Sequence, residues 1–308
     1  MITLRTKAEV RAHVMAARAA GRTVGLVPTM GAFHAGHHAL MDAARESCGE
    51  VVVSLFVNPA QFDEASDLAA YPRSEARDAA EAEALGVDVL FAPAPEEVYP
   101  EGFATSVRVD GLGDVFEGAE RGPGHFAGVC TVVAKLLNVV APDLAFFGQK
   151  DAQQVAVLRR MVADLDIPVE LRIVPTVREP DGLALSSRNV RLAPAERARA
   201  VALFEGLRAA EAAIAAGEDD PALVRGAAVA AMAEHDVEPE YLALVDPDSF
   251  SELDRIDGRV LVAVAARVGQ TRLIDNALVE GSDPFSQRNE VTPVATPAQR
   301  ASTTTKES

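Results

Sequence analysis

The feature that most constrains this chain is a regular alternation of short apolar runs with segments of helical pattern. Residues 51–57 form a near-continuous apolar run, which is typical of a parallel strand whose two faces are both covered by helices. Similar runs occur at residues 24–29, 87–91, 144–147 and 169–174. This alternation predicts an α/β fold with a doubly wound, mostly parallel sheet of the Rossmann-like type.

The segments between these runs predict helices. We expect them over residues 3–20, 39–47, 71–85 and 128–140 and from residue 152, with Thr3 or Thr6 capping the first. Residues 92–124 are rich in Pro and Gly and are predicted to be irregular, at a length that usually indicates a functional segment or a lid.

The pattern changes near residue 176. Ala-rich helices are predicted at residues 194–216 and 221–235, followed by strands at 241–245, 260–268 and 273–279, the last two forming a hairpin across Gly269-Gln270. We therefore expect a Rossmann-like domain over residues 1–176 and a small α+β lid domain over 177–281. Residues 282–308 are polar and are expected to form a disordered tail.

Composition excludes several classes of protein. The formal charge of −17 argues against a nucleic-acid-binding surface, which requires clustered Lys and Arg. No apolar stretch is long enough to span a membrane, and no apolar segment follows the basic residues near the N-terminus as in a signal peptide. The two cysteines, Cys48 and Cys130, have no metal or redox spacing, so a reducing cytoplasm is expected.

The first candidate site is the turn Pro-Thr-Met-Gly-Ala-Phe-His-Ala-Gly-His at residues 28–37. It joins a predicted strand to a predicted helix, so free backbone N–H groups at the helix start can bind phosphate. Gly31 and Gly36 allow close approach of a ligand, while His34 and His37 supply side-chain donors on one helical face. A plain structural turn is the alternative reading, and a zinc site lacks a third ligand.

Three further polar clusters follow predicted strands or turns. Asn58 and Gln61 follow the strand at 51–57, where open α/β sheets bind ligands. Gln154 belongs with these two amides, Lys150 and Asp151 follow the strand at 144–147, and Ser186-Ser187-Arg188 comes later. Cations and hydroxyl donors suit a triphosphate, and neutral amides suit a small hydroxy acid. The alternatives are a Pro-containing turn with two exposed amides at Asn58 and Gln61, a surface ion pair at Lys150, and a helix N-cap at Ser186.

The four clusters together resemble the pantothenate synthetase (pantoate–β-alanine ligase) family of His-x-Gly-His nucleotidyltransferases, in order and spacing, over about residues 20–280. The segments that carry the resemblance are residues 28–37, 56–62 (Phe-Val-Asn-Pro-Ala-Gln-Phe), 147–154 (Phe-Gly-Gln-Lys-Asp-Ala-Gln-Gln), 175–179 and 185–189. The resemblance implies ATP-dependent condensation of (R)-pantoate with β-alanine, through pantoyl adenylate, to pantothenate, AMP and pyrophosphate. This is a step of coenzyme A biosynthesis. It also implies a homodimer and Mg²⁺ bound with the ATP phosphates, without a metal site made by the protein alone.

The resemblance further implies roles for individual residues. Those expected to act on the phosphates are His34, His37, Lys150 and Arg188, with His37 as a candidate proton donor. The expected ATP site consists of Met30, Gly31, Ala32, Phe33, His34, Ala35, Gly36, His37, Gly148, Gln149, Lys150, Asp151, Val177, Leu185, Ser186, Ser187 and Arg188. Gln61, Gln154 and Asn58 are expected to bind pantoate or β-alanine.

Four departures and two rival functions complete the sequence picture. Ala60 replaces the larger apolar residue common before the Gln, and Leu185 stands where Met is frequent. Gln149 stands where many members carry Glu, and Arg121 lies one residue farther from His125 than the family pattern, so no role is transferred to it. One rival is a nicotinate- or pantetheine-phosphate adenylyltransferase, which needs an additional cationic site for its phosphate substrate. The other is a nucleotide-binding regulatory module without catalysis. The neutral Gln61 disfavours the first rival, and the intact phosphate-binding set disfavours the second.

Overall fold

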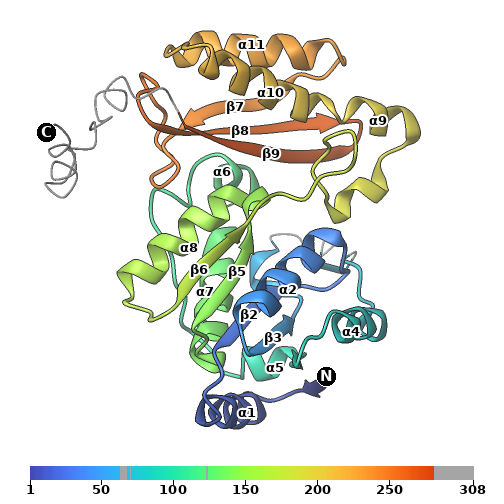
Figure 1. The fold of residues 1–308 in the computed structure, drawn as a ribbon, viewed down its shortest axis with the longest axis vertical. Coiled ribbons are helices and arrows are strands. Elements are labelled where there is room, and N and C mark those ends of the chain that lie inside the picture. Colours follow the sequence, from blue (N-terminus) through green and yellow to red (C-terminus); the bar gives the residue numbers. More distant parts are fainter. Residues whose placement is uncertain (63–67, 70, 123, 281–308) are drawn as a thin grey trace, which may run out of the picture.

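The computed structural model describes residues 1–62, 68–69, 71–122 and 124–280. Its centre is a six-stranded sheet in the order β1-β4-β3-β2-β5-β6 (Figure 1). All neighbouring strands are parallel. The strands are β1 (Ile2–Leu4), β2 (Val24–Thr29), β3 (Glu50–Leu55), β4 (Val89–Phe91), β5 (Leu144–Gly148) and β6 (Glu170–Val174). The predicted parallel sheet is confirmed.

Helices cover both faces of this sheet, as the continuous apolar strands require (Figure 1). Leu26 and Val52 contribute to a core with α1 (Lys7–Ala19), α7 (His125–Val140) and α8 (Ala152–Asp164). Their strand neighbours Val27 and Val53 point the opposite way, into a second core with α2 (Ala35–Ser47) and α4 (Glu75–Ala84). The sheet is therefore doubly wound, and the carboxyl ends of its strands are left for a site.

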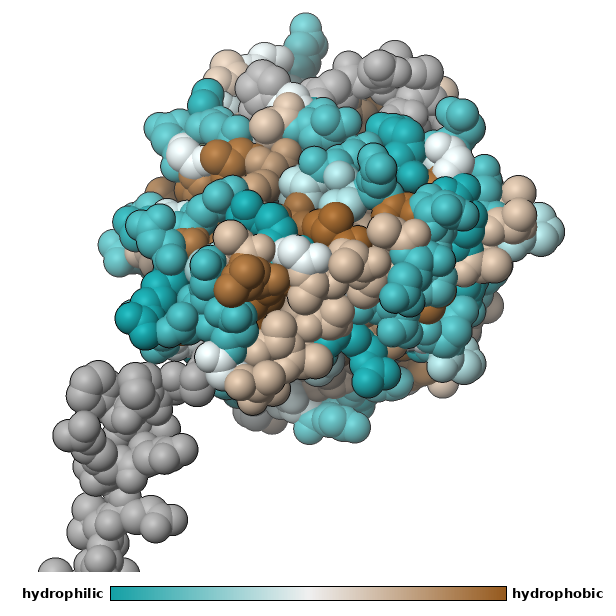
Figure 2. All heavy atoms as spheres, turned by 90° about the horizontal axis from the view of Figure 1, so that it is seen from above, coloured by the Kyte–Doolittle hydropathy of each residue, from teal (hydrophilic) through white to brown (hydrophobic). Residues whose placement is uncertain are grey.

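The C-terminal part has its own sheet and core. Strands β7 (Pro239–Val245), β8 (Arg259–Val268) and β9 (Thr271–Glu280) are antiparallel, and the hairpin across Gly269-Gln270 is confirmed. Helices α10 (Ala202–Ala215) and α11 (Pro221–Ala233) cover one face, and a short helix α9 (Pro194–Arg199) precedes them. Figure 2 shows this end from above: hydrophilic side chains dominate it, and hydrophobic ones lie in separate groups.

The opposite face of the C-terminal sheet rests on the N-terminal part. Ala152 and Ala156 of α8 pack against Ala243, Ala263 and neighbouring apolar residues of the small sheet. Small side chains allow the sheet and the helix to approach closely. Because α8 begins directly after the turn that carries Lys150, this contact brings the C-terminal sheet next to the candidate site. A domain boundary at residue 176 stays a prediction.

Several element boundaries differ from the sequence prediction. The first helix is shorter than expected: residues 2–4 form edge strand β1, and Thr6 caps α1 through a capping box with Glu9. A three-residue strand owes its conformation to pairing with β4, which local propensity does not reveal. Helix α4 begins at Glu75 rather than 71, and α2 begins earlier, at Ala35.

Other segments contain more or different helix than expected. The stretch 92–124 contains two short helices, α5 (Pro95–Val98) and α6 (Glu117–Arg121). The helix expected over 194–216 is divided into α9 and α10. Within the residues that the structure describes, no helix combines the length and apolar character needed to cross a bilayer. The tail at 282–308 lies outside the described residues.

Candidate active site

The turn between β2 and α2 has an unusual backbone that a buried carboxylate stabilises. Gly31 has a φ of 86° and Ala32 a φ of 52°. The backbone N–H groups of Ala32 and Phe33 each donate to one carboxylate oxygen of Asp78, at 3.0 Å. A Cβ on Gly31 would lie 2.9 Å from the same carboxylate and 2.7 Å from Leu55. Glycine is therefore required at 31, and Asp78 fixes the shape of the turn.

The two histidines of the motif are oriented by the backbone of the helix start. His34 is the N-cap of α2, and its Nδ1 accepts a hydrogen bond from the Gly36 N–H at 3.1 Å. The Nδ1 of His37 accepts from the His34 N–H at 3.3 Å, and the ring centroids lie 4.2 Å apart. Because each Nδ1 accepts, the neutral rings carry their proton on Nε2. Both histidines therefore present Nε2–H donors.

The surroundings of the histidines favour the neutral rings. Burial and the nearby charges of His34 and His38 lower the pKa of His37 to about 3. Burial, followed by the charge of Lys150, lowers the pKa of His34. Neutral Nε2–H groups bind phosphate oxygens as hydrogen-bond donors. A role for His37 as a proton donor stays a prediction.

The amides after β3 are organised by helix α7. Gly128 of α7 lies so close to this loop that a Cβ would be 2.2 Å from the Ala60 carbonyl oxygen. The buried Asn58 uses its Nδ2 to donate to the Gly128 carbonyl at 3.1 Å and to Gln61 Oε1 at 3.0 Å. Its Oδ1 accepts from Tyr99 Oη at 2.7 Å. Asn58 therefore orients Gln61 rather than reaching into open space.

Gln61 connects this loop to the phosphate-binding turn. Its Nε2 lies 3.2 Å from the Met30 sulfur, within the turn that carries the histidines. A side-chain amide of a partly buried residue thus lies beside the candidate nucleotide site. The turn at 28–37 and the amides at 58 and 61 therefore lie close together, because they follow the carboxyl ends of the neighbouring parallel strands β2 and β3.

Lys150 lies in a single 3₁₀ turn, Gln149–Asp151, between β5 and α8. Its Nζ is 3.6 Å from Asp151 Oδ1, and 17% of its side chain is exposed, against 50% for Asp151. The crowded protein surroundings raise the pKa of the Asp151 carboxyl, but the charges of Lys150, Arg121 and Arg188 outweigh this effect and lower it. Asp151 is therefore ionised among three cations. Gln154 lies one turn later on α8 and is partly buried.

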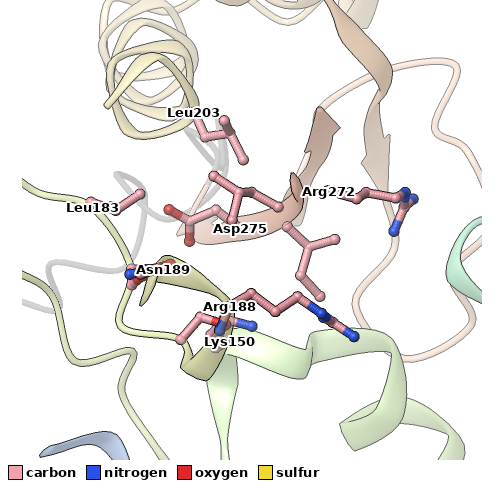
Figure 3. Close-up of a pocket in the computed structure, with 11 residues that line it drawn as sticks. Lys150, Leu183, Arg188, Asn189, Leu203, Arg272 and Asp275 are labelled. Atoms are coloured by element: carbon pink, nitrogen blue, oxygen red, sulfur yellow. The ribbon is translucent and has the colours of Figure 1, made fainter. Parts of the chain in front are cut away.

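Lys150 and Arg188 line one pocket together with β9 (Figure 3). Ser186 caps a 3₁₀ helix, Ser187–Arg191, through a bond from the Arg188 N–H to Ser186 Oγ at 3.2 Å. Within the described part of the chain, the Arg188 guanidinium forms no ion pair. Burial and the charge of Arg121 lower the pKa of Arg188, so an anion bound here would be stabilised.

The segment leading to Arg188 is attached to β9. Arg178 forms a bidentate pair with the buried Asp275, at 2.6 and 3.1 Å, and donates to the Gly182 carbonyl at 3.0 Å. The Leu185 N–H donates to the Val177 carbonyl at 2.9 Å, so Val177 and Leu185 are held side by side. The predicted nucleotide residues at 177 and 185–188 therefore belong to one folded-back segment.

Sequence reasoning missed Asp78 as a support of the turn and missed the Arg178–Asp275 pair. Asp78 had one detectable signal: it precedes Ala82 by four residues, and both lie on the buried face of α4. An acidic residue on an apolar helix face indicates a buried partner. No local pattern identifies Arg178 and Asp275 as partners, since they are 97 residues apart.

Comparison with known proteins identifies the family. The family model for pantoate-beta-alanine ligase matches residues 2–278. The pantothenate synthetase of Moorella thermoacetica is 51% identical over 286 residues, or 92% of this chain and 100% of that protein. The crystal structure of the Thermus thermophilus enzyme aligns with a TM-score of 0.83 and 47% identity, covering 90% of this chain and 99% of that one.

A more distant structure comes from Francisella tularensis, a pantoate–β-alanine ligase in complex with β-γ ATP and β-alanine. It aligns with a TM-score of 0.73 and 32% identity, covering 90% of this chain and 97% of that one. The chain belongs to the pantoate–β-alanine ligase family of enzymes.

Proposed function

We propose that this enzyme condenses (R)-pantoate with β-alanine through a pantoyl adenylate. In the first half-reaction a pantoate carboxylate oxygen attacks the α-phosphorus of ATP, and the bond to pyrophosphate breaks. In the second, the β-alanine amine attacks the acyl carbon of the adenylate. AMP then leaves, and the amine loses a proton to solvent. The family assignment and the ATP and β-alanine of the Francisella tularensis complex support these substrates.

The triphosphate would bind between the turn at 28–37 and the segment at 186–188. The Nε2–H groups of His34 and His37 and the guanidinium of Arg188 are the donors, together with the hydroxyls of Ser186 and Ser187. Lys150 would contact the α-phosphate, where negative charge increases in the transition state. A cation that is already in place at that point lowers the barrier without reorganisation.

Pantoate would bind beside Gln61 and Gln154. Neutral amides provide donors for the carboxylate and acceptors for the hydroxyls, without the second cationic site that a phosphate substrate would need. Asn58 would act indirectly, because its amide hydrogen bonds are made within the protein. The family resemblance implies that Asn58 contacts substrate directly. We propose the indirect role because Asn58 is buried and its amide bonds to Gln61 and Gly128.

Mg²⁺ would enter with the ATP phosphates. Among the described residues, no group of three or more His, Cys, Asp or Glu side chains is placed to hold a metal ion. The site offers the exposed carboxylate of Asp151, whereas Asp78 is buried and its two oxygens accept the Ala32 and Phe33 N–H groups. Mg²⁺ usually binds through one or two carboxylates together with substrate phosphates and water. The donors therefore fit a phosphate-borne ion, which would supply charge neutralisation.

The remaining features of the proposal concern the whole enzyme. We propose that residues 177–281 act as a lid, because Ser186 and Arg188 line one pocket together with Lys150 of the first domain. A homodimer and a cytoplasmic location are part of the same proposal and follow from the family resemblance and the free cysteines Cys48 and Cys130.

The convergence of two neutral histidines, Lys150 and Arg188 next to the neutral Gln61 is the observation that carries this proposal. Purified enzyme with ATP, Mg²⁺, pantoate and β-alanine should release AMP and pyrophosphate. Omission of β-alanine should leave one equivalent of pantoyl adenylate on the enzyme. ADP as the main nucleotide product would refute the mechanism.

A further inference from the structure

Asn276 of β9 is a buried amide whose side chain is bonded to the turn that carries Lys150. Only 4% of the residue is exposed. Its Nδ2 donates to the carbonyl oxygens of Gln149, at 3.0 Å, and of Lys150, at 2.9 Å. Its Oδ1 accepts from Gln149 Nε2 at 3.0 Å. Three hydrogen bonds thus connect the C-terminal sheet to a single 3₁₀ turn.

This turn depends on an external partner. Gly148 precedes it as N-cap and has no side chain to bond the turn, and a Cβ placed there would meet open space. A single 3₁₀ turn has weaker hydrogen-bond geometry than a helix and needs support from outside. Asn276 provides that support, because its side chain bonds to the partly buried carbonyl oxygens of both Gln149 and Lys150.

The neighbouring residue on β9 connects the other half of the nucleotide site. Asp275 accepts the bidentate pair from Arg178, and it also accepts from the Asn276 N–H at 2.8 Å. Consecutive residues of one strand therefore contact the Lys150 turn and the segment leading to Arg188. In Figure 3, Asp275, Lys150 and Arg188 surround the same pocket.

We propose that Asn276 is a positioning residue that holds Lys150 for adenylate formation. The inference rests on the proposed function. The Lys150 side chain has four rotatable bonds, so the direction of its Nζ depends on a fixed backbone. A displaced backbone carbonyl at 149 or 150 moves the cation away from the α-phosphate. Misplacement by about 1 Å can reduce a rate by roughly 100-fold.

The test is a double-mutant cycle on the first half-reaction. Asn276→Ala should slow single-turnover formation of pantoyl adenylate by roughly 10- to 100-fold, because Lys150 is no longer held. Binding of pantoate and amide formation from supplied pantoyl adenylate should change little. In a Lys150→Ala background, adding Asn276→Ala should cause no further loss, because a residue that acts through Lys150 has nothing left to position.

Two variants separate positioning from loss of fold. Val262→Ala removes a buried side chain from β8, within the C-terminal core, and should lower the melting temperature while leaving adenylate formation nearly unchanged. Asn276→Asp keeps the shape of the side chain but places a carboxylate oxygen against the two carbonyls. It should reproduce the rate loss of Asn276→Ala in the first half-reaction and spare the second.

Additive losses in the double variant, or equal slowing of both half-reactions by Asn276→Asp, would overturn the positioning role and leave a structural one. A wild-type enzyme that releases no pyrophosphate from ATP and pantoate would overturn the proposed function and this inference with it. An active wild type with additive losses would overturn only the inference, so the two failures are distinguishable.

Discussion

Replacing Asp78 with alanine should destabilise the phosphate-binding turn and the whole protein. The carboxylate accepts the Phe33 N–H, which is buried, and the Ala32 N–H, which is partly buried. A buried donor left without a partner costs about 1–3 kcal/mol, and a partly exposed one costs less because water can reach it. We therefore expect the free energy of unfolding to fall by about 2–4 kcal/mol.

The same change should weaken ATP binding, because the turn at Gly31 and Ala32 keeps its left-handed backbone only while both N–H groups are held. Urea unfolding near neutral pH measures the loss of stability, and titration calorimetry with a non-hydrolysable ATP analogue measures the loss of affinity. Glu83→Ala on the same helix is the matched control, since that side chain is 65% exposed and should change stability by less than about 0.5 kcal/mol. Equal stabilities for the Asp78→Ala and Glu83→Ala variants would refute the argument.

Three further predictions follow from the site. Lys150→Ala should slow adenylate formation by roughly two to three orders of magnitude, because one preorganised donor contributes about 3–4 kcal/mol to the transition state. Supplied pantoyl adenylate should restore amide formation in this variant. Equal slowing of both half-reactions would contradict the assignment. Gln154→Ala should weaken pantoate binding and leave ATP affinity unchanged, as measured by calorimetry for each ligand; unchanged pantoate affinity would remove Gln154 from the pocket. The pKa of His37 is lowered from 6.5 to about 3 in the folded protein. The free energy of unfolding is therefore independent of this ring above pH 6.5, and it decreases by about 1.4 kcal/mol per pH unit as the pH falls from 6.5 toward 3. His37→Gln should abolish this part of the pH dependence, and identical urea midpoints against pH for both proteins would show that the ring is not buried as described.

The fold was largely predictable because its main signals are local. The run at residues 51–57 and its counterparts show the strands directly, and the strand at 24–29 matches β2 residue for residue. Edge strand β1 was missed because three residues carry no periodicity, and its conformation depends on pairing with β4. The short helix α6 was missed for a related reason: buried Glu117 is held by Arg121, Arg272 and Tyr241, two of them from the C-terminal sheet.

The sequence points to side chains whose chemistry suits a ligand, and it does not reveal the side chains that bond to each other within the protein. His34, Lys150 and Arg188 are chemically conspicuous in the sequence. Asn276 is not, since an asparagine in a strand predicts nothing until the strand is placed against the Lys150 turn. Likewise, the sequence does not reveal that the Asn58 amide bonds to Gln61 and to the Gly128 carbonyl, and its contact with substrate stays a prediction. Long-range hydrogen bonding of this kind depends on the tertiary fold.

The burial of the central sheet on both faces also limits which positions of this enzyme tolerate amino-acid substitutions. Val51, Val52 and Val53 are all fully buried, so a polar side chain at any of these positions would need a buried hydrogen-bond partner. Loops leave the sheet at the two ends of its strands. The carboxyl ends of the strands carry the candidate site, so loops at the opposite ends can change without touching a ligand bound there. The architecture therefore places the residues that stabilise the sheet apart from the loops that form the candidate site.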